Sequence, residues 1–182
     1  MKARPPAVRV LAGRWKGRRL EAGPAARPTS SRARAALFDV LGGRIAGARV
    51  LDLYAGTGAV GIEAVSRGAE RAVLVESDAA PLRRSIERIG GPGELAVVER
   101  PAAVALEDLA RRGERFDLVF ADPPYASGSA GGELDAAARL LAPDGVLVLQ
   151  QDERAEAQGI PGVRLLERRA YGRNVFLFFG MR

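Results

Sequence analysis

Short apolar runs alternate with helical stretches along most of the chain, and this alternation restricts the possible folds more than any other feature. Five runs are expected to be strands, at residues 49–53, 72–76, 95–98, 116–121 and 145–150. Helical patterns separate them, at residues 59–67, 79–89, 102–110 and 132–141. Nearly continuous apolar strands that are joined by helices form a parallel sheet covered on both faces. We therefore expect one α/β domain, which also suits a length of 182 residues.

The two ends of the chain depart from this alternation. Residues 8–11 and a second run ending at Leu20 are expected to form a small β-hairpin, and residues 163–168 and 174–179 a terminal one. A helix capped by Thr29, Ser30 or Ser31 should follow the first hairpin and end near Leu41. We accordingly divide the chain into a basic extension, residues 1–26, and a main domain, residues 27–182.

The composition excludes several kinds of chemistry. The chain has no cysteine and no histidine, so zinc sites, iron–sulfur clusters, histidine-dependent triads and cysteine nucleophiles are ruled out, and we expect no metal. It also lacks an apolar run of about 18 residues and a signal-peptide core. We therefore expect a cytoplasmic protein that has no membrane partner. A monomer is expected as well.

The positive charge is concentrated near the start of the chain. Residues 1–34 hold ten basic residues and one acidic residue, a balance of +9, whereas the whole chain carries +6. The rest of the chain is therefore slightly acidic, at −3. A basic segment on an acidic body is typical of a phosphate-binding surface, although a solvated charged edge would have the same composition.

A glycine-rich turn follows the first predicted core strand. The sequence from Val50 to Gly61 takes an apolar strand through Gly56 and Gly58 into a helix, and Glu76 stands at the end of the next strand. Open parallel sheets bind nucleotides at such turns, where glycine lets a ligand approach the backbone and an acidic residue accepts hydrogen bonds from a ribose. The turn predicts a nucleotide-type cofactor.

Two cofactor classes fit this turn. Residues 56–61 match the G-x-G-x-x-G pattern of dinucleotide sites, but the carboxylate of Asp52 would repel a pyrophosphate. The same carboxylate suits a ligand with a positive end, such as S-adenosylmethionine. We therefore favour S-adenosylmethionine over a nicotinamide dinucleotide.

The run Asp122-Pro123-Pro124-Tyr125 after the fourth core strand is the most specific motif. The prolines lack backbone donors and stiffen the loop, so that the Asp122 carboxylate and nearby carbonyls can accept hydrogen bonds from an exocyclic base amine. Tyr125 offers a flat surface on which a flipped base could stack. The run resembles the catalytic motif of methyltransferases that act on such an amine, and the resemblance implies that Asp122, Pro123, Pro124 and Tyr125 are the catalytic residues.

Several segments, in order, resemble bacterial 16S rRNA guanine-N2 methyltransferases of the RsmD type. They are residues 13–20, 27–38, 51–69, 75–76, 121–125 and 171–172, which together extend over essentially the whole chain. The resemblance implies a Rossmann-like class I methyltransferase fold with a mostly parallel seven-stranded sheet, and S-adenosyl-L-methionine as cofactor. It also implies transfer of a methyl group to one guanine of 16S rRNA near the P site, with an assembling 30S particle as the partner. Ser31 and Ala35 replace an Asp and a Glu that the family usually has, so no role is carried over to them.

These motifs give a specific set of expected contacts. The cofactor site is expected to comprise Asp52, Tyr54, Ala55, Gly56, Gly58, Glu76, Ser77 and, for the adenine, Ala103. The rRNA site is expected to comprise Lys16, Arg18, Arg27, Thr29, Arg32 and Arg34. The alternatives are a DNA or RNA adenine-N6 methyltransferase, a DNA cytosine-N4 methyltransferase, a non-catalytic RNA-binding module, and a nicotinamide-dependent oxidoreductase.

Overall fold

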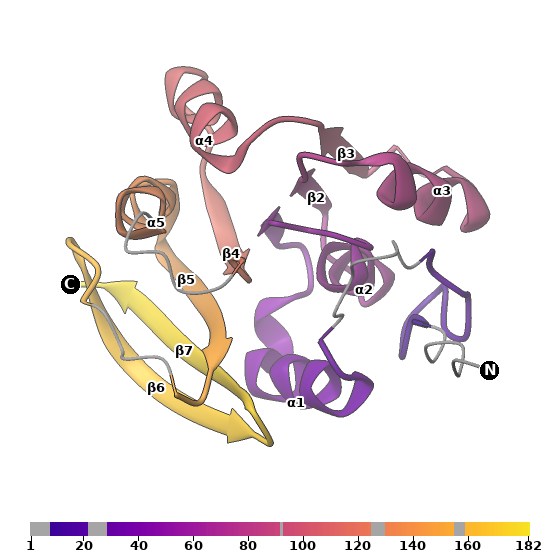
Figure 1. The fold of residues 1–182 in the computed structure, drawn as a ribbon, viewed down its shortest axis with the longest axis horizontal. Helices are drawn as coiled ribbons and strands as arrows, with labels where there is room; N and C mark the ends of the chain where they lie inside the picture. Colours follow the sequence, from indigo (N-terminus) through magenta and orange to yellow (C-terminus); the bar gives the residue numbers. More distant parts are fainter. Residues whose placement is uncertain (1–7, 22–28, 92, 125–129, 155–158) are drawn as a thin grey trace.

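The structure, a computed structural model, describes residues 8–21, 29–91, 93–124, 130–154 and 159–182. Its strands form one seven-stranded sheet in the order β3-β2-β1-β4-β5-β7-β6 (Figure 1). The strands are β1 (Arg49–Leu53), β2 (Arg71–Val75), β3 (Leu95–Val98), β4 (Phe116–Ala121), β5 (Leu141–Asp152), β6 (Val163–Tyr171) and β7 (Asn174–Met181). β1 to β5 are parallel, and β7 is antiparallel to both β5 and β6. The predicted α/β sheet and its terminal hairpin are confirmed.

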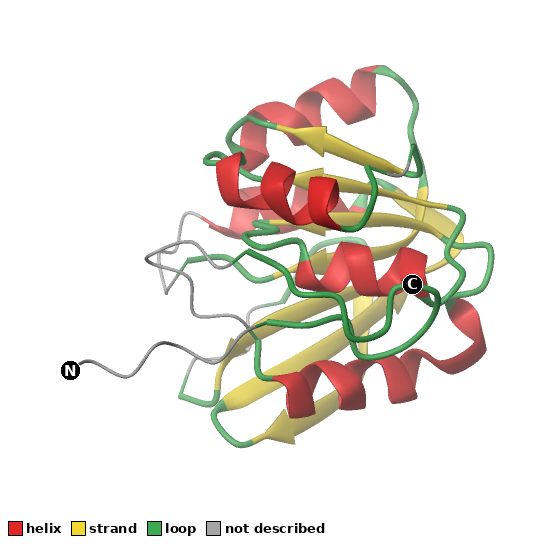
Figure 2. Ribbon diagram, turned by 90° about the vertical axis from the view of Figure 1, so that its right-hand side faces the viewer, coloured by secondary structure: helices red, strands yellow, loops and turns green. Residues whose placement is uncertain are grey.

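Helices cover both faces of this sheet (Figure 2). They are α1 (Ser31–Leu41), the short 3-10 helix η1 (Gly42–Arg44), α2 (Ala59–Ser66), α3 (Ala80–Arg88), α4 (Ala102–Arg111) and α5 (Ala130–Ala138). The side chain of Ser30 accepts a hydrogen bond from the Ala33 amide and thereby caps α1. No helix in the described ranges is long and apolar enough to span a bilayer.

The alternation of side chains along each strand builds two separate cores. Val50 and Phe120 belong to the core beneath α1, α2 and α3, whereas Leu51 and Val119 belong to the core beneath α4 and α5. By the same alternation Asp52 on β1 and residue 122 after β4 lie on the α1 side. The sheet therefore brings polar residues of neighbouring strands to one face at its carboxyl edge.

The boundary between α5 and β5 differs from the prediction. The helix was expected to end at residue 141 and the strand to begin at residue 145, but α5 ends at Ala138 and β5 begins at Leu141. Leu141 pairs with Phe116 before an irregularity in the β4–β5 register. Pairing with β4 and burial of Leu141 outweigh the helical pattern there.

The β-hairpin expected near the N-terminus is not formed, and that prediction is wrong. Residues 8–21 form a loop closed by one isolated antiparallel bridge between Arg9 and Arg19. Cross-loop pairing is limited to a few backbone bonds, such as those from the Val10 and Leu20 N–H groups to the carbonyls of Arg18 and Val8. Toward the tip of the loop, the N–H groups of Leu11, Ala12 and Trp15 bind side chains of α2 instead. The predicted domain boundary at residue 26 lies outside the described residues, but Val8, Val10 and Leu20 are buried in the same core as α1.

Candidate active site

A cleft of about 270 Å³ lies at the carboxyl edge of the sheet. Residues that follow β1, β2, β3 and β4 line it, together with Glu133 of α5; they are Tyr54, Val75, Glu76, Ser77, Arg100, Pro101, Ala102, Pro123, Pro124 and Glu133. This edge is where parallel α/β sheets bind ligands. Tyr54, Glu76, Ser77, Pro123 and Pro124 were predicted as site residues, and the fold brings them together.

The glycine turn between β1 and α2 has a backbone that few side chains permit. Gly56 and Gly58 have φ angles of 55° and 76°, and Gly58 also packs so closely that a Cβ there would lie 2.5 Å from Leu82 Cδ1. Among the described non-glycine residues Tyr54 alone has a positive φ, at 58°. Strained backbone of this kind concentrates at functional sites, because the surrounding fold must hold it in place.

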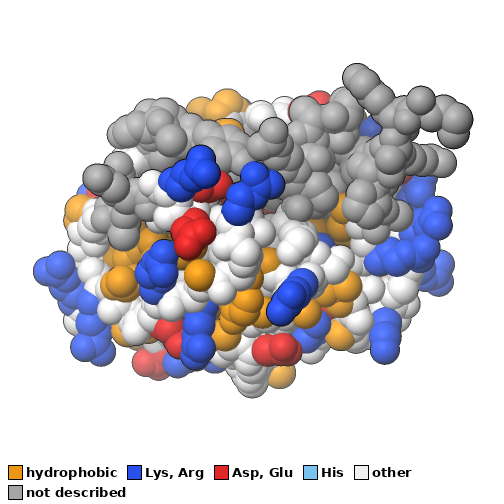
Figure 3. Space-filling model, turned by 60° about the horizontal axis from the view of Figure 1, so that its bottom comes forward, with side chains coloured by type: hydrophobic (Ala, Val, Ile, Leu, Met, Phe, Trp, Pro, Cys, Tyr) orange, Lys and Arg blue, Asp and Glu red, His pale blue; other side chains and the backbone are white. Residues whose placement is uncertain are grey.

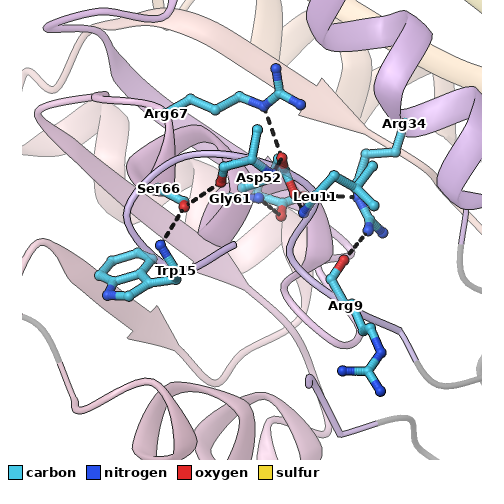
Figure 4. Close-up of polar contacts among 10 residues, drawn as sticks. Arg9, Leu11, Trp15, Arg34, Asp52, Gly61, Ser66 and Arg67 are labelled. Atoms are coloured by element: carbon cyan, nitrogen blue, oxygen red, sulfur yellow. Dashed lines mark hydrogen bonds and ion pairs between the residues drawn. The ribbon is translucent and has the colours of Figure 1, made fainter. Parts of the chain in front are cut away.

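Two acidic side chains hold this turn and the start of α2 by accepting hydrogen bonds from backbone amides. Asp52 Oδ2 lies 2.8 Å from the Gly61 nitrogen, and Glu76 Oε2 lies 2.8 Å from the Gly56 nitrogen (Figure 4 shows Asp52 and Gly61). Asp52 is buried, and burial raises its pKa to about 7 although the bond from Gly61 opposes the rise. Both carboxylates that were predicted to bind the cofactor therefore also fix the shape of the turn.

The tyrosine at the end of β1 joins the turn to α5. The Tyr54 hydroxyl donates a hydrogen bond to the Glu133 carboxylate, and burial together with this bond raises the pKa of Tyr54. Glu133 was not predicted from the sequence, because it lies in a helix with no motif. Only the packing of α5 beside the cleft shows its place.

The adenine contact predicted for Ala103 stays a prediction, and the structure points to its neighbours. Ala103 is exposed on α4 and is absent from the lining of the cleft, whereas Arg100, Pro101 and Ala102 line it. Arg100 and Pro101 lie in the short connection after β3, at the carboxyl edge of the sheet, and Ala102 is the first residue of α4. In the sequence, the feature that could have identified these lining residues is their position after the end of a strand, not their residue type.

Asp122 lies beside the cleft, at the end of β4. Its Oδ2 accepts a hydrogen bond from Gln150 Nε2 at 3.0 Å, and burial raises its pKa to about 7. Pro123 and Pro124 follow it along the cleft wall, and Tyr125 lies outside the described residues. A carboxylate held at this position can accept hydrogen bonds from an amine and can take up its proton near neutral pH.

The structure separates the predicted rRNA-binding residues into two groups. Lys16, Arg18 and Arg32 are exposed, as that role requires, and Arg27 lies outside the described residues. On the face shown in Figure 3, Lys and Arg side chains are spread among apolar and acidic ones rather than gathered in a single patch. Direct phosphate contact therefore stays a prediction for Lys16, Arg18 and Arg32.

Arg34 and Thr29 do not fit the predicted rRNA role. Arg34 has an exposed fraction of 0% because it lies on the inner face of α1, where it forms an ion pair with Glu63 and donates to the Arg9 carbonyl (Figure 4). Thr29 is buried as well, and its hydroxyl donates to Gln150 Oε1 at 2.7 Å. For both side chains, contacts inside the protein replace contact with rRNA.

Glu63 of α2 is the acceptor that anchors the N-terminal loop. Its two oxygens accept the backbone N–H groups of Leu11 and Ala12 at 2.7 and 2.9 Å, and Arg67 Nε lies 2.8 Å from Oε1. One turn further along α2, Ser66 Oγ accepts the Trp15 amide and donates to the Ala12 carbonyl. Figure 4 shows this docking of the loop on α2.

The comparison with protein families settles the relationship. A family model described as Conserved hypothetical protein 95 matches residues 8–180. The chain belongs to this family. The resemblance that the motifs indicated is thereby confirmed, because methyltransferases of the RsmD type are among the relatives found.

Two curated relatives of this chain are named as rRNA methyltransferases. Ribosomal RNA small subunit methyltransferase D of Escherichia coli (strain K12) is 38% identical over 125 residues, which are 66% of this chain and 62% of that protein. The match thus spans less than two thirds of that relative. Putative rRNA methyltransferase YlbH of Bacillus subtilis is 32% identical over 91% of this chain and 94% of that protein.

A solved structure supports the fold. A hypothetical protein of Thermus thermophilus is 39% identical, with a TM-score of 0.83 over 96% of this chain and 99% of that chain. The seven-stranded mixed sheet of this family member is thus that of a known structure.

Proposed function

We propose that the protein transfers a methyl group from S-adenosyl-L-methionine to the exocyclic N2 amine of a guanine in 16S rRNA, with an assembling 30S particle as its substrate. The observation that carries the proposal is the position of Asp122, which directly precedes Pro123 and Pro124 in the wall of a cleft also lined by Tyr54 and Glu76; Glu76 in turn accepts a hydrogen bond from the Gly56 amide of the glycine turn. The names of the relatives support the choice of rRNA as the substrate class.

The residues of the cleft fit S-adenosylmethionine. At Gly56 a Cβ would meet only the Tyr54 carbonyl oxygen, at 4.0 Å, so a ligand could lie against the backbone there. Glu76, which lines the cleft, would accept hydrogen bonds from ribose hydroxyls. Arg100, Pro101 and Ala102 border the part of the cleft next to Ser77 and would bound the adenine. When bound, S-adenosylmethionine supplies a methyl group made electrophilic by its sulfonium.

Asp122 would act on the amine. Its ionised carboxylate accepts hydrogen bonds from the N–H groups, which directs the nitrogen lone pair, and it can take up the proton that the nitrogen loses. The rigid Pro123-Pro124 segment keeps the carbonyls beside it from moving. Tyr125 is proposed as the surface on which the flipped base stacks.

The exposed basic residues Lys16, Arg18 and Arg32, together with Arg27, would bind phosphates on either side of the flipped guanine. These contacts place the RNA without reading its sequence, because phosphates are the same at every nucleotide.

The direct test measures tritium transfer from labelled S-adenosylmethionine to 16S rRNA and to 30S particles from cells that lack this enzyme. The wild-type enzyme should transfer tritium to free 16S rRNA or to the 30S particles. A nucleoside digest of the labelled RNA should then contain tritiated N2-methylguanosine. Asp122→Asn should slow transfer by about 10²-fold or more, whereas Asp39→Asn, at an exposed position on α1, should not. Labelled N6-methyladenosine would mean that the enzyme methylates adenine instead of guanine. RNA binding without methyl transfer would mean that the protein is a non-catalytic RNA-binding module.

A further inference from the structure

A buried chain of two hydrogen bonds leads from the start of α1 to Asp122. Thr29 Oγ1 donates to Gln150 Oε1 at 2.7 Å, and Gln150 Nε2 donates to Asp122 Oδ2 at 3.0 Å. Thr29 and Gln150 are 9% and 6% exposed, so water has little access to the bond between them, whereas the bond to Asp122 is partly buried. The three residues are far apart in sequence, and only the fold brings them together.

The pairing of β4 and β5 explains why Gln150 reaches Asp122. Phe120 is paired with Val148 and Ala121 with Leu149, so the next position along each strand places residue 122 beside residue 150. Val148 and Phe120 both belong to the core on the α1 side, and alternation puts Gln150 and Asp122 on that side as well. The segment that enters α1 runs over this face, which brings Thr29 to the other end of the amide.

The direction of the two bonds gives Thr29 a specific role. A glutamine amide has one accepting end and one donating end, and its neighbours decide which way it points. Because the Thr29 hydroxyl donates to Oε1, the amide must present its N–H₂ group to Asp122. Without that hydroxyl the amide can reverse and place its oxygen against the carboxylate, where two acceptors repel each other.

We infer that Gln150 and Thr29 are positioning residues for Asp122: Thr29 fixes the orientation of the Gln150 amide, and the amide holds the Asp122 carboxylate ionised and aimed at the target amine. This inference rests on the proposed function in one respect, namely that the target group is an amine. The orientation of the Asp122 carboxylate does not depend on the proposed function. The sequence motif ends at Tyr125, so the motif alone gives no sign that residues 29 and 150 take part.

The surroundings of Asp122 act on its ionisation in both directions. Asp52 on β1 interacts with it electrostatically, and Glu76 and Glu133 line the same cleft, where Arg100 is the opposing positive charge. Burial also favours the neutral acid. The N–H donor of Gln150 acts in the other direction, because a hydrogen bond to the charged form stabilises it.

The test compares Thr29→Val with Thr29→Ser, because valine keeps the shape of threonine without its hydroxyl and serine keeps the hydroxyl. The pKa of Asp122 is read in the free protein by carbon NMR of labelled aspartate carboxyls, with Asp122→Asn assigning the signal. Thr29→Val should raise this pKa by about one pH unit, and Thr29→Ser should leave it near the wild-type value. Gln150→Leu should raise it at least as far as Thr29→Val does.

A control separates positioning from general loss of stability. Ser85→Ala removes another buried hydroxyl, which accepts the Glu21 amide and donates to the Pro81 carbonyl, far in sequence from Asp122. It should lower the unfolding midpoint without moving the pKa of Asp122. If Gln150→Leu does not fold, the comparison of the two Thr29 variants decides the question.

The same variants then enter the methyl-transfer assay. The acid limb of the pH–rate profile should shift to higher pH in Thr29→Val by the amount seen in the NMR titration, and Thr29→Ser should restore it. A wild-type pKa in Thr29→Val would overturn the inference even if the enzyme methylates rRNA. A shifted pKa in a protein that transfers no methyl group would instead leave the hydrogen-bond chain intact and refute the proposed function.

Discussion

Replacement of Glu63 by glutamine should release the N-terminal loop from α2. The substitution keeps the shape of the side chain but gives it one accepting end, so either the Leu11 or the Ala12 amide would face an N–H₂ group. It also removes the carboxylate that forms the ion pair with the fully buried Arg34, whose pKa is already lowered by burial. Leaving a buried charge without its partner typically costs about 3 kcal/mol or more.

The single tryptophan makes this loss measurable, because Trp15 belongs to the docked loop and its amide binds Ser66. Urea unfolding is followed by Trp15 fluorescence for the loop and by far-UV circular dichroism for the sheet and helices. With a slope of about 2 kcal/mol per molar urea, Glu63→Gln should lower the fluorescence midpoint by about 1.5 M. Glu70→Gln, at an exposed position, should change neither signal.

The two probes also distinguish local release from global unfolding. If the loop detaches first, the fluorescence transition of Glu63→Gln precedes the circular dichroism transition. If the loop and sheet unfold together, both midpoints fall equally, since Val8, Val10 and Leu20 are part of the α1-side core. Wild-type midpoints for both probes in Glu63→Gln would refute the reasoning, because they would mean that the buried carboxylate contributes nothing to docking.

Three further predictions concern pH, the glycine turn and RNA. Asp52 and Asp122 have folded-state pKa values of about 7 against an ordinary 3.8, so the folded protein retains protons that the unfolded chain has released. The free energy of unfolding should therefore fall as pH rises from about 4 to about 7, and Asp52→Asn should flatten that dependence in urea titrations. Gly58→Ala should lower the free energy of unfolding by about 1–3 kcal/mol and weaken S-adenosylmethionine binding in calorimetry, because the new Cβ meets Leu82. Gly17→Ala is the control: Gly17 has a similar φ but no neighbour within 4 Å, so its substitution measures the cost of backbone strain alone. Lys16→Ala combined with Arg18→Ala should weaken rRNA binding and reduce its salt dependence without affecting cofactor affinity, and an unchanged salt slope would remove these residues from the RNA surface.

The positions of the polar residues show how far a pattern in the sequence can lead. Glu76 and Asp122 were identified because each follows an apolar strand, and Asp52 because it stands four residues before Gly56; parallel strands end at one edge, which brings these positions together. Glu133 could not be identified from such a pattern, because it lies in a helix that only tertiary packing brings to the cleft. Arg34 shows the opposite error, since its membership of a basic segment suggested a surface position while the inner face of α1 buries it.

The N-terminal loop illustrates the same limit. Its alternating residues and its glycines predict a hairpin, which satisfies backbone groups between two strands. In the folded chain the carboxylate of Glu63 and the hydroxyl of Ser66 bind the N–H groups of Leu11, Ala12 and Trp15, so the pairing does not extend to the tip of the loop. Local sequence does not contain this competition, because the competing acceptors lie about fifty residues further along, in α2.

The sequence by itself determined the alternation of strands and helices, the glycine turn and the D-P-P-Y motif, because each depends on residues that are neighbours in the chain. The tertiary structure alone decided which side chains meet. It placed Gln150 between Thr29 and Asp122 and Glu63 beneath the N-terminal loop, through hydrogen bonds between residues 28 to 121 positions apart. Such bonds arise from strand register and helix packing, which bring distant residues into hydrogen-bonding distance of one another, and no local pattern in the chain encodes that proximity.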